Sequence, residues 1–218
     1  MSDITPIKPG GEGLAELEHF FGESMAHFQA GRLKEAEAEL SEIQRRQPDI
    51  PEVLHLMALI ELQTGRPEAA AGHLEKAVAR QPESADLHNL LGGALKRAGR
   101  LEEAVLAYDK AVSLGPELAE AHYNLGNALK ELRRFDDAVP SYRRAVELEP
   151  GFVDAHYNLG LVLMAAGRPD EAARAYRDAV AVNPRNAEAH MNLGNALEAV
   201  DETDEAAAAY RRAIELRP

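Results

Sequence analysis

Proline recurs at one fixed interval along this chain of 218 residues. A constant interval of 34 residues is typical of a stacked repeat architecture, in which each unit packs only against its neighbours. The prolines that define this interval are Pro48, Pro82, Pro116, Pro150, Pro184 and Pro218. With proline placed at position 32 of each repeat, six repeats cover residues 17–50, 51–84, 85–118, 119–152, 153–186 and 187–218.

Apolar residues inside each repeat follow a helical period and predict two helices. In the fourth repeat, Leu125, Gly126 and Leu129 occupy positions 7, 8 and 11 of the first helix, while Ala138 and Tyr142 occupy positions 20 and 24 of the second. Small residues at positions 8 and 20 let the helices approach closely, and large residues fill the space between them. A Gly-Arg pair or a variant of it joins the two helices, because glycine supplies the left-handed backbone that ends a helix.

Leu-Gly at positions 7 and 8, Ala at 20, an aromatic at 24 and Pro at 32 together resemble the tetratricopeptide repeat (TPR). Two positions depart from that pattern, since position 4 is His and position 11 is Leu in the last four repeats. The resemblance implies an all-α fold, a right-handed superhelical solenoid of six stacked helix-turn-helix units over residues 14–218. Residues 1–13 are rich in Pro and Gly and are expected to form a disordered tail.

Net charge and composition limit the classes of partner that the chain is expected to bind. The net charge of −13 argues against nucleic acid and against anionic membrane surfaces. The chain has no cysteine, and residues 1–13 lack the apolar run of a signal peptide. We therefore expect a cytoplasmic protein with a protein or peptide partner, no nucleic acid and no membrane.

In TPR proteins the first helix of each repeat lines a concave groove with positions 2, 5, 6, 9, 12 and 13. Asparagine recurs on these positions, and its amide offers both a donor and an acceptor to a peptide backbone. The arrangement resembles the asparagine ladder in the TPR domain of O-GlcNAc transferase; the alternative is that these amides bond neighbouring helices of the repeat. The predicted peptide-binding residues are Asn89, Tyr123, Asn124, Asn127, Tyr157, Asn158, Asn192, Asn195, Lys96, Arg97 and Lys130.

Acidic residues at position 2 of the repeats fall in first turns, where a negative charge stabilises a helix. Together they can also attract a cationic segment. Position 5 carries no Lys or Arg, so the carboxylate clamp of TPR domains that bind chaperone tails is not expected. The position-2 acids are Glu52, Asp86, Glu120, Asp154 and Glu188.

No metal, cofactor or catalytic site is expected. Four histidines recur at position 4, but equivalent positions of packed helices lie about 8–10 Å apart or more, too far to share one metal ion. The serines have no paired base, and no glycine loop suited to phosphate appears. The histidines concerned are His88, His122, His156 and His190.

Three functions follow from the resemblance. The first is a protein–protein interaction scaffold that binds an extended peptide in its concave groove, without being an enzyme. The second is the N-terminal, substrate-recruiting part of a larger glycosyltransferase or sulfotransferase, with the natural chain continuing past Pro218. The third is a self-assembling scaffold that forms a homo-oligomer through an uncapped C-terminal end.

Overall fold

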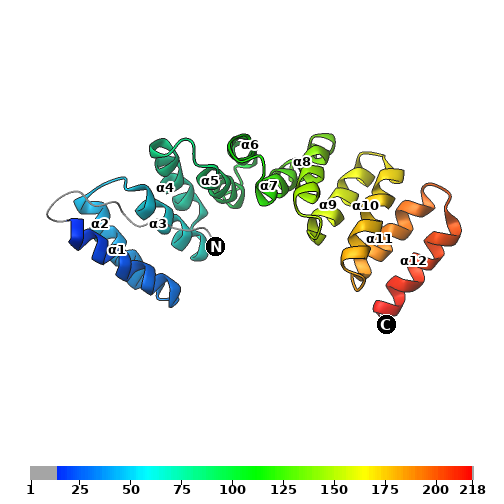
Figure 1. Ribbon diagram of the computed structural model, residues 1–218, viewed down its shortest axis with the longest axis horizontal. Coiled ribbons are helices and arrows are strands. Elements are labelled where there is room, and N and C mark those ends of the chain that lie inside the picture. Colours follow the sequence, from blue (N-terminus) through cyan, green and yellow to red (C-terminus); the bar gives the residue numbers. More distant parts are fainter. Residues whose placement is uncertain (1–13, 218) are drawn as a thin grey trace. The chain divides into compact units, whose positions relative to one another are not determined.

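A computed structural model describes residues 14–217 of the chain; the tail predicted for residues 1–13 lies outside the described residues. Within residues 14–217 the regular secondary structure is entirely α-helical, with twelve helices (Figure 1). The all-α, helix-turn-helix prediction is therefore confirmed. The chain divides into two compact parts, Met1–Leu114 and Gly115–Pro218, and each is described by itself.

The N-terminal part contains three consecutive helix pairs. Within each pair the two helices pack antiparallel across a short turn, and the second helix of one pair packs against the first helix of the next. Its helices are α1 (Leu14–Gln29), α2 (Leu33–Arg46), α3 (Pro51–Gln63), α4 (Pro67–Arg80), α5 (Ala85–Arg97) and α6 (Leu101–Leu114).

The C-terminal part repeats the same arrangement. In addition to the contacts within and between successive pairs, the first helices α7 and α9 touch each other directly. Its helices are α7 (Ala119–Glu131), α8 (Phe135–Leu148), α9 (Val153–Ala165), α10 (Pro169–Val182), α11 (Ala187–Glu198) and α12 (Thr203–Leu216). None of the described helices is long and apolar enough to cross a membrane.

The turn inside each repeat depends on one left-handed residue at position 15. Glycine fills this position in four repeats, with φ between 73° and 81°. Arg133 and Asp201 adopt the same conformation in the other two, with φ of 59° and 62°. Residues with a side chain rarely adopt this left-handed conformation. Arg133 and Asp201 adopt it nevertheless, so the geometry of the turn requires it.

Glycine at position 8 is required by the tyrosine at position 24. A Cβ atom added to Gly160 would lie 2.5 Å from Tyr176 Cε1, and one added to Gly92 would lie 2.6 Å from Tyr108 Cε1. The tyrosine ring therefore lies directly on the backbone of the first helix. The first two repeats have no glycine at position 8, and there the residue at position 24 is Leu instead of Tyr.

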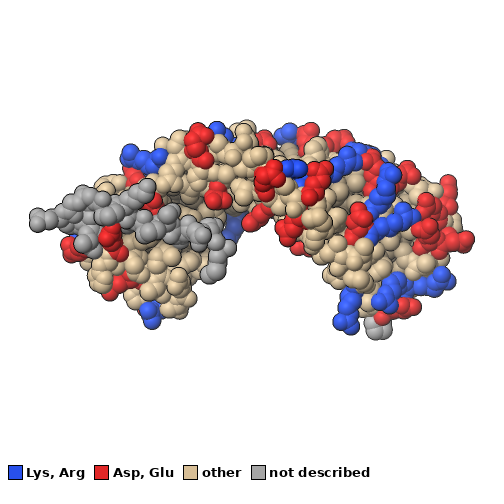
Figure 2. Space-filling view, in the orientation of Figure 1, with Lys and Arg blue, Asp and Glu red and all other residues tan. Residues whose placement is uncertain are grey.

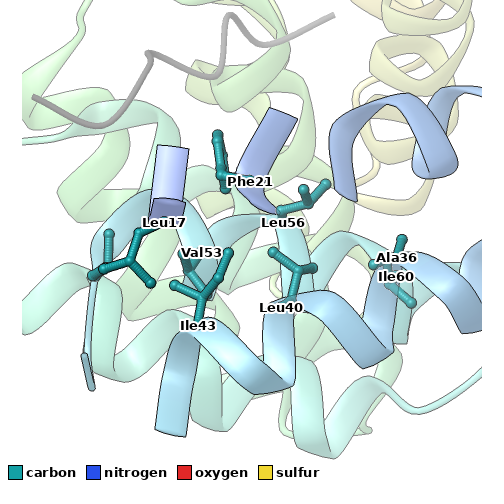
Figure 3. Packing of buried hydrophobic residues seen from close by; sticks show 9 residues of the cluster. Leu17, Phe21, Ala36, Leu40, Ile43, Val53, Leu56 and Ile60 are labelled. Atoms are coloured by element: carbon teal, nitrogen blue, oxygen red, sulfur yellow. The ribbon is translucent and has the colours of Figure 1, made fainter. Parts of the chain in front are cut away.

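The core of the first two repeats is built from aliphatic residues of three helices. Leu17 and Phe21 of α1 face Leu40 and Ile43 of α2, and α3 closes the cluster with buried residues that include Val53 (Figure 3). These side chains are almost completely removed from solvent. Residues from different repeats therefore share one continuous core, as expected for a stacked array.

The first two repeats also carry a polar pair that the later repeats lack. In α1 and α2, His27 at position 11 lies 3.3 Å from Glu39 at position 23. In α3 and α4 the two residue types are exchanged, and Glu61 at position 11 lies 2.8 Å from His73 at position 23. Position 11 is Leu in the last four repeats, and position 23 is Ala in three of them and Ser in the fourth repeat.

The histidines at position 4 tie each of the last four repeats to the turn before it. The His88 Nε2 atom lies 3.0 Å from the carbonyl oxygen of Pro82, six residues earlier. The same contact recurs at 3.0 to 3.1 Å for His122, His156 and His190. Since a proline carbonyl can only accept, each imidazole donates from Nε2. Among residues 14–217 no group of three His, Cys, Asp or Glu side chains is arranged to hold a metal ion.

Ion pairs join successive repeats on the second helices. Arg100 at position 16 lies 3.1 Å from Glu75 at position 25 of the preceding repeat. In the last repeat the charges are exchanged, because Glu202 at position 16 lies 2.7 Å from Arg177 at position 25. Figure 2 shows acidic and basic side chains intermingled on the surface of the C-terminal part.

Candidate functional site

The predicted peptide-binding residues lie on first helices of both compact parts. Asn89, Lys96 and Arg97 are on α5 in the N-terminal part. The other eight are on α7, α9 and α11 in the C-terminal part. We call positions 2, 5, 6, 9, 12 and 13 of α7, α9 and α11 the first-helix face. The C-terminal part is treated as the candidate site, because it holds most of these residues.

Two tyrosine–asparagine pairs connect adjacent helices on this face. Asn158 Nδ2 donates to Tyr123 Oη at 3.2 Å, so position 6 of α9 is joined to position 5 of α7. Asn192 Nδ2 donates to Tyr157 Oη at 3.0 Å, which joins α11 to α9 in the same way. The structure thus brings four of the predicted residues together, in a pattern that repeats with the array.

The remaining hydrogen-bonding capacity differs between these two asparagines. Lys130 Nζ donates to Asn158 Oδ1 at 2.7 Å, so both ends of the Asn158 amide are engaged inside the protein. Within residues 14–217, Asn192 Oδ1 accepts no hydrogen bond, and its side chain is only partly buried. Asn192 therefore offers a hydrogen-bond acceptor to a ligand. Asn158 can do so only after its hydrogen bond from Lys130 breaks.

Aromatic rings support the tyrosines of the face. The ring centroid of Tyr123 lies 4.6 Å from that of Phe152 and 5.9 Å from that of Tyr142. Tyr157 lies 5.9 Å from Tyr176. Such tilted and edge-on contacts favour one orientation of each ring. Burial, and secondarily the nearby Glu188, raises the pKa of Tyr157.

Asparagines at position 9 bond within their own repeat. Asn127 Oδ1 accepts from Tyr142 Oη at 2.7 Å, and Asn195 Oδ1 accepts from Tyr210 Oη at 2.9 Å. The Tyr142 ring is fully buried, and burial is the main cause of its raised pKa. These amides therefore accept from a tyrosine hydroxyl, which is buried at Tyr142 and partly exposed at Tyr210, and this is a structural task in addition to the predicted binding role.

Arg97, one of the basic residues predicted for the groove, also has a structural contact. Its Nη2 atom donates to the backbone carbonyl of Leu62 at 2.6 Å. Leu62 lies in the last turn of α3, where carbonyl groups have no partner within the helix. Arg97 thus caps the first helix of the preceding repeat, while Lys96 beside it is partly buried on α5.

A pocket of about 260 Å³ opens at the α11 end of the first-helix face. Tyr157, Met191 and Asn192 line one side of it, and Ile214 and Arg217 of the α12 end line the other. Met191 and Ile214 are unusually exposed for apolar residues, at 43% and 63% of their surface. A salt bridge of 2.7 Å between Arg217 and Glu188 forms part of the rim.

The sequence predicted an uncapped C-terminal end with apolar surface near Ile214, but it did not predict the pocket that Ile214 forms with Met191. Ile214 stands at position 28, where the second to fifth repeats have Val. The valines are partly buried, but Ile214 is exposed. The difference depends on what packs beside α12, and only the structure provides that information.

The sequence profile of the tetratricopeptide repeat family matches residues 55–119, 123–173 and 160–218. The chain belongs to the tetratricopeptide repeat family. A crystal structure of MamA is similar to this TPR chain, with 28% identity, a TM-score of 0.69, and coverage of 73% of this chain and 94% of MamA. Residues 41 to the end of MamA from Desulfovibrio magneticus match with 25% identity, a TM-score of 0.69, and coverage of 76% and 94%.

A third structure, of YrrB, shares the TPR fold with this chain. It matches with 23% identity and a TM-score of 0.73, over 82% of this chain and 92% of YrrB. YrrB is described as a TPR protein with an unusual peptide-binding site. No curated protein sequence matched this TPR chain.

Proposed function

We propose that this TPR protein is an interaction scaffold that binds an extended peptide along the first-helix face of its C-terminal part. The observation that carries the proposal is the pocket at α11 and α12, where exposed apolar side chains lie beside an open acceptor. Met191 and Ile214 provide the apolar surface, and Asn192 Oδ1 provides the acceptor. Proteins bind ligands in pockets of this kind, which are mainly apolar with few orienting polar groups.

The rigidity of the face also supports peptide binding. Each tyrosine and asparagine of the two pairs is held by a hydrogen bond to the neighbouring helix. A preformed surface loses little conformational entropy when a ligand binds, so the peptide pays most of the ordering cost. The peptide-binding site that is described for YrrB shows that the same fold can perform this task.

The asparagines divide into two groups under this proposal. Asn192, with Tyr157 beside it, contacts the peptide main chain directly. Asn158 does so only after Lys130 moves away from its carbonyl oxygen. A continuous asparagine ladder, as in O-GlcNAc transferase, therefore requires Lys130 to release Asn158. The chain binds its partner without a catalytic step of its own.

Selection from a library of random peptides tests the proposal. Peptides enriched on the natural chain are then measured against a Met191→Ala, Ile214→Ala variant, which removes the two exposed apolar side chains of the pocket. Losing this contact area should weaken binding about tenfold or more. A Leu106→Ala, Val182→Ala variant is the matched control, since both residues are exposed apolar side chains outside the pocket.

Two results would count against the proposal. One is that no peptide is enriched on the natural chain. The other is that enriched peptides bind the pocket variant and the control variant equally well. Thermal melts of both variants should match that of the natural chain, because the exchanged side chains lie on the surface.

A further inference from the structure

The first-helix face is strongly acidic. Of the charged residues at its six positions on α7, α9 and α11, only Lys130 is basic, and it is bonded to Asn158. The acidic residues are all exposed. They are Glu120, Glu131, Asp154, Glu188 and Glu198.

Of the three acids at position 2 of this face, two are not paired with a cation of the described residues. Glu120 and Asp154 form no ion pair within residues 14–217, and Glu188 pairs with Arg217. The second helices differ, because there an arginine faces acidic partners. Arg177, for example, lies 2.7 Å from both Glu202 and Glu205. The acidic charge left without an ion-pair partner therefore includes Glu120 and Asp154, at position 2 of α7 and α9.

We propose that the ligand of this face is a cationic extended peptide with an apolar side chain that enters the pocket between Met191 and Ile214. This inference rests on the proposed function and specifies the chemical class of its partner. Opposite charge on a ligand speeds its association and selects against acidic competitors. An apolar residue fits the exposed surfaces of Met191 and Ile214, next to the acceptor Asn192 Oδ1.

Spacing adds a constraint on the peptide sequence. Directly packed helices lie about 8–10 Å apart, so position-2 acids of successive first helices recur at roughly that interval or more along the face. An extended chain advances about 3.3 Å per residue. Basic residues at about every third position therefore meet Glu120, Asp154 and Glu188 in turn, and the apolar residue follows near α11.

The test uses two labelled nine-residue peptides and the full chain. One probe contains three copies of Arg-Thr-Val, and the other contains three copies of Glu-Thr-Val. Fluorescence anisotropy at low salt measures both. We expect the arginine probe to bind at least about tenfold more tightly than the glutamate probe, and we expect added salt to reduce this difference because the pairs are exposed.

Two triple variants that change the net charge by the same amount test whether the arginine probe binds at the first-helix face. The face variant, Glu120→Gln, Asp154→Asn and Glu188→Gln, neutralises first-turn acids of α7, α9 and α11. The control, Asp136→Asn, Asp170→Asn and Asp204→Asn, neutralises first-turn acids of α8, α10 and α12. Both raise the net charge by three and remove similar helix-dipole interactions.

The face variant should bind the arginine probe about tenfold more weakly, while the control stays within about twofold of the natural chain. Equal losses in both variants would show that only overall charge matters, and would overturn the inference. Equal binding of the two probes, or no saturable binding of either, would also overturn it. A light-scattering increase caused by the chain alone would instead assign the face to a second copy, and would equally overturn it.

Failure of this inference is distinguishable from failure of the proposed function. If library peptides depend on Met191 and Ile214 but carry no excess of basic residues, the peptide-binding function stands and the cationic specificity is wrong. If no library peptide depends on the pocket, the proposed function itself is wrong.

Discussion

At the scale of single residues, each glycine at position 8 has a specific neighbour. Gly92 and Gly93 are adjacent in α5, but only Gly92 lies under the ring of Tyr108. An added Cβ atom would lie 2.6 Å from the ring at Gly92, whereas the nearest atom to Gly93 would be the Tyr108 hydroxyl at 3.7 Å. Two adjacent glycines in the middle of the same helix should therefore respond oppositely to substitution.

We predict that Gly92→Ala destabilises the protein and that Gly93→Ala stabilises it. Overpacking against Tyr108 costs about 1–3 kcal/mol, while alanine gains up to about 1 kcal/mol over glycine in a helix. Urea unfolding of both variants measures the difference. In a Tyr108→Leu background, which reproduces the Leu of the first two repeats, Gly92→Ala should become neutral or stabilising. Equal effects at the two glycines would contradict the packing seen here.

His55 predicts a pH dependence of stability. Burial lowers the pKa of this imidazole below its ordinary value of 6.5, with a smaller opposing effect from Asp86. The unfolded chain then binds more protons than the folded chain as the pH falls below about 6.5. Stability from neutral His55 is therefore present above that pH and is lost as the pH falls through the lowered pKa.

The measurement is the urea midpoint at pH 7.5 and at pH 5.5. The natural chain should lose more stability on acidification than a His55→Leu variant, in which this residue cannot take up a proton. An identical shift in both proteins would show that His55 does not contribute.

At the scale of helices, the reversed His–Glu pairs separate the first two repeats from the others. Glu61 is only 5% exposed and depends on His73 for its partner. A buried ion pair often contributes no more than well-packed apolar residues, but a broken pair leaves a costly unpaired charge. The later repeats, with Leu and a small residue at these positions, provide the apolar alternative within the same chain.

We predict that Glu61→Leu with His73→Ala leaves the stability unchanged or raises it by about 1–4 kcal/mol. His73→Ala alone should cost about 3 kcal/mol or more, because Glu61 then remains buried without its histidine. A double-mutant cycle in urea separates the two effects. If the double variant is as unstable as the single variant, the pair is essential and the apolar replacement fails.

Helix pairs were predictable from the sequence, whereas hydrogen-bond partners were not. Proline spacing and the Leu-Gly pattern predicted helix-turn-helix units because they depend on local periodicity. The partners of Asn158 depend on side-chain distances across helices, since Lys130 and Tyr123 are 28 and 35 residues away in sequence. Apolar surface near Ile214 was expected at an uncapped end, whereas the pocket that Ile214 shares with Met191 depends on contacts in space and was not predictable. The binding role of the asparagines remains a prediction.

At the scale of the whole chain, stability in a repeat array is the sum of individual repeats and the contacts between neighbours. Helix α10 packs extensively against both α9 and α11, while α12 packs mainly against α11. Both have 14 residues and a similar Ala-Tyr pattern. The two helices are similar in sequence but differ in their packed neighbours. Comparing how well their backbone amides are protected from hydrogen exchange therefore shows the effect of those neighbours.

We predict that amide hydrogens of α12 exchange faster than those of α10. Local opening requires less free energy where a helix has fewer packed neighbours. Hydrogen exchange followed by mass spectrometry on the full chain measures this directly. Equal protection in the two helices would indicate that the C-terminal part opens as one cooperative unit.

The ion pairs that join successive repeats have opposite polarity at different junctions, and this affects which recombinations of the repeats preserve them. Arg100 meets Glu75, but Glu202 at the same position meets Arg177. A recombination event that joined the second repeat directly to the sixth would place Glu202 against Glu75, and one that joined the fifth to the third would place Arg100 against Arg177. Although the repeats look interchangeable in sequence, some deletions and shuffles of repeats therefore create like-charge contacts.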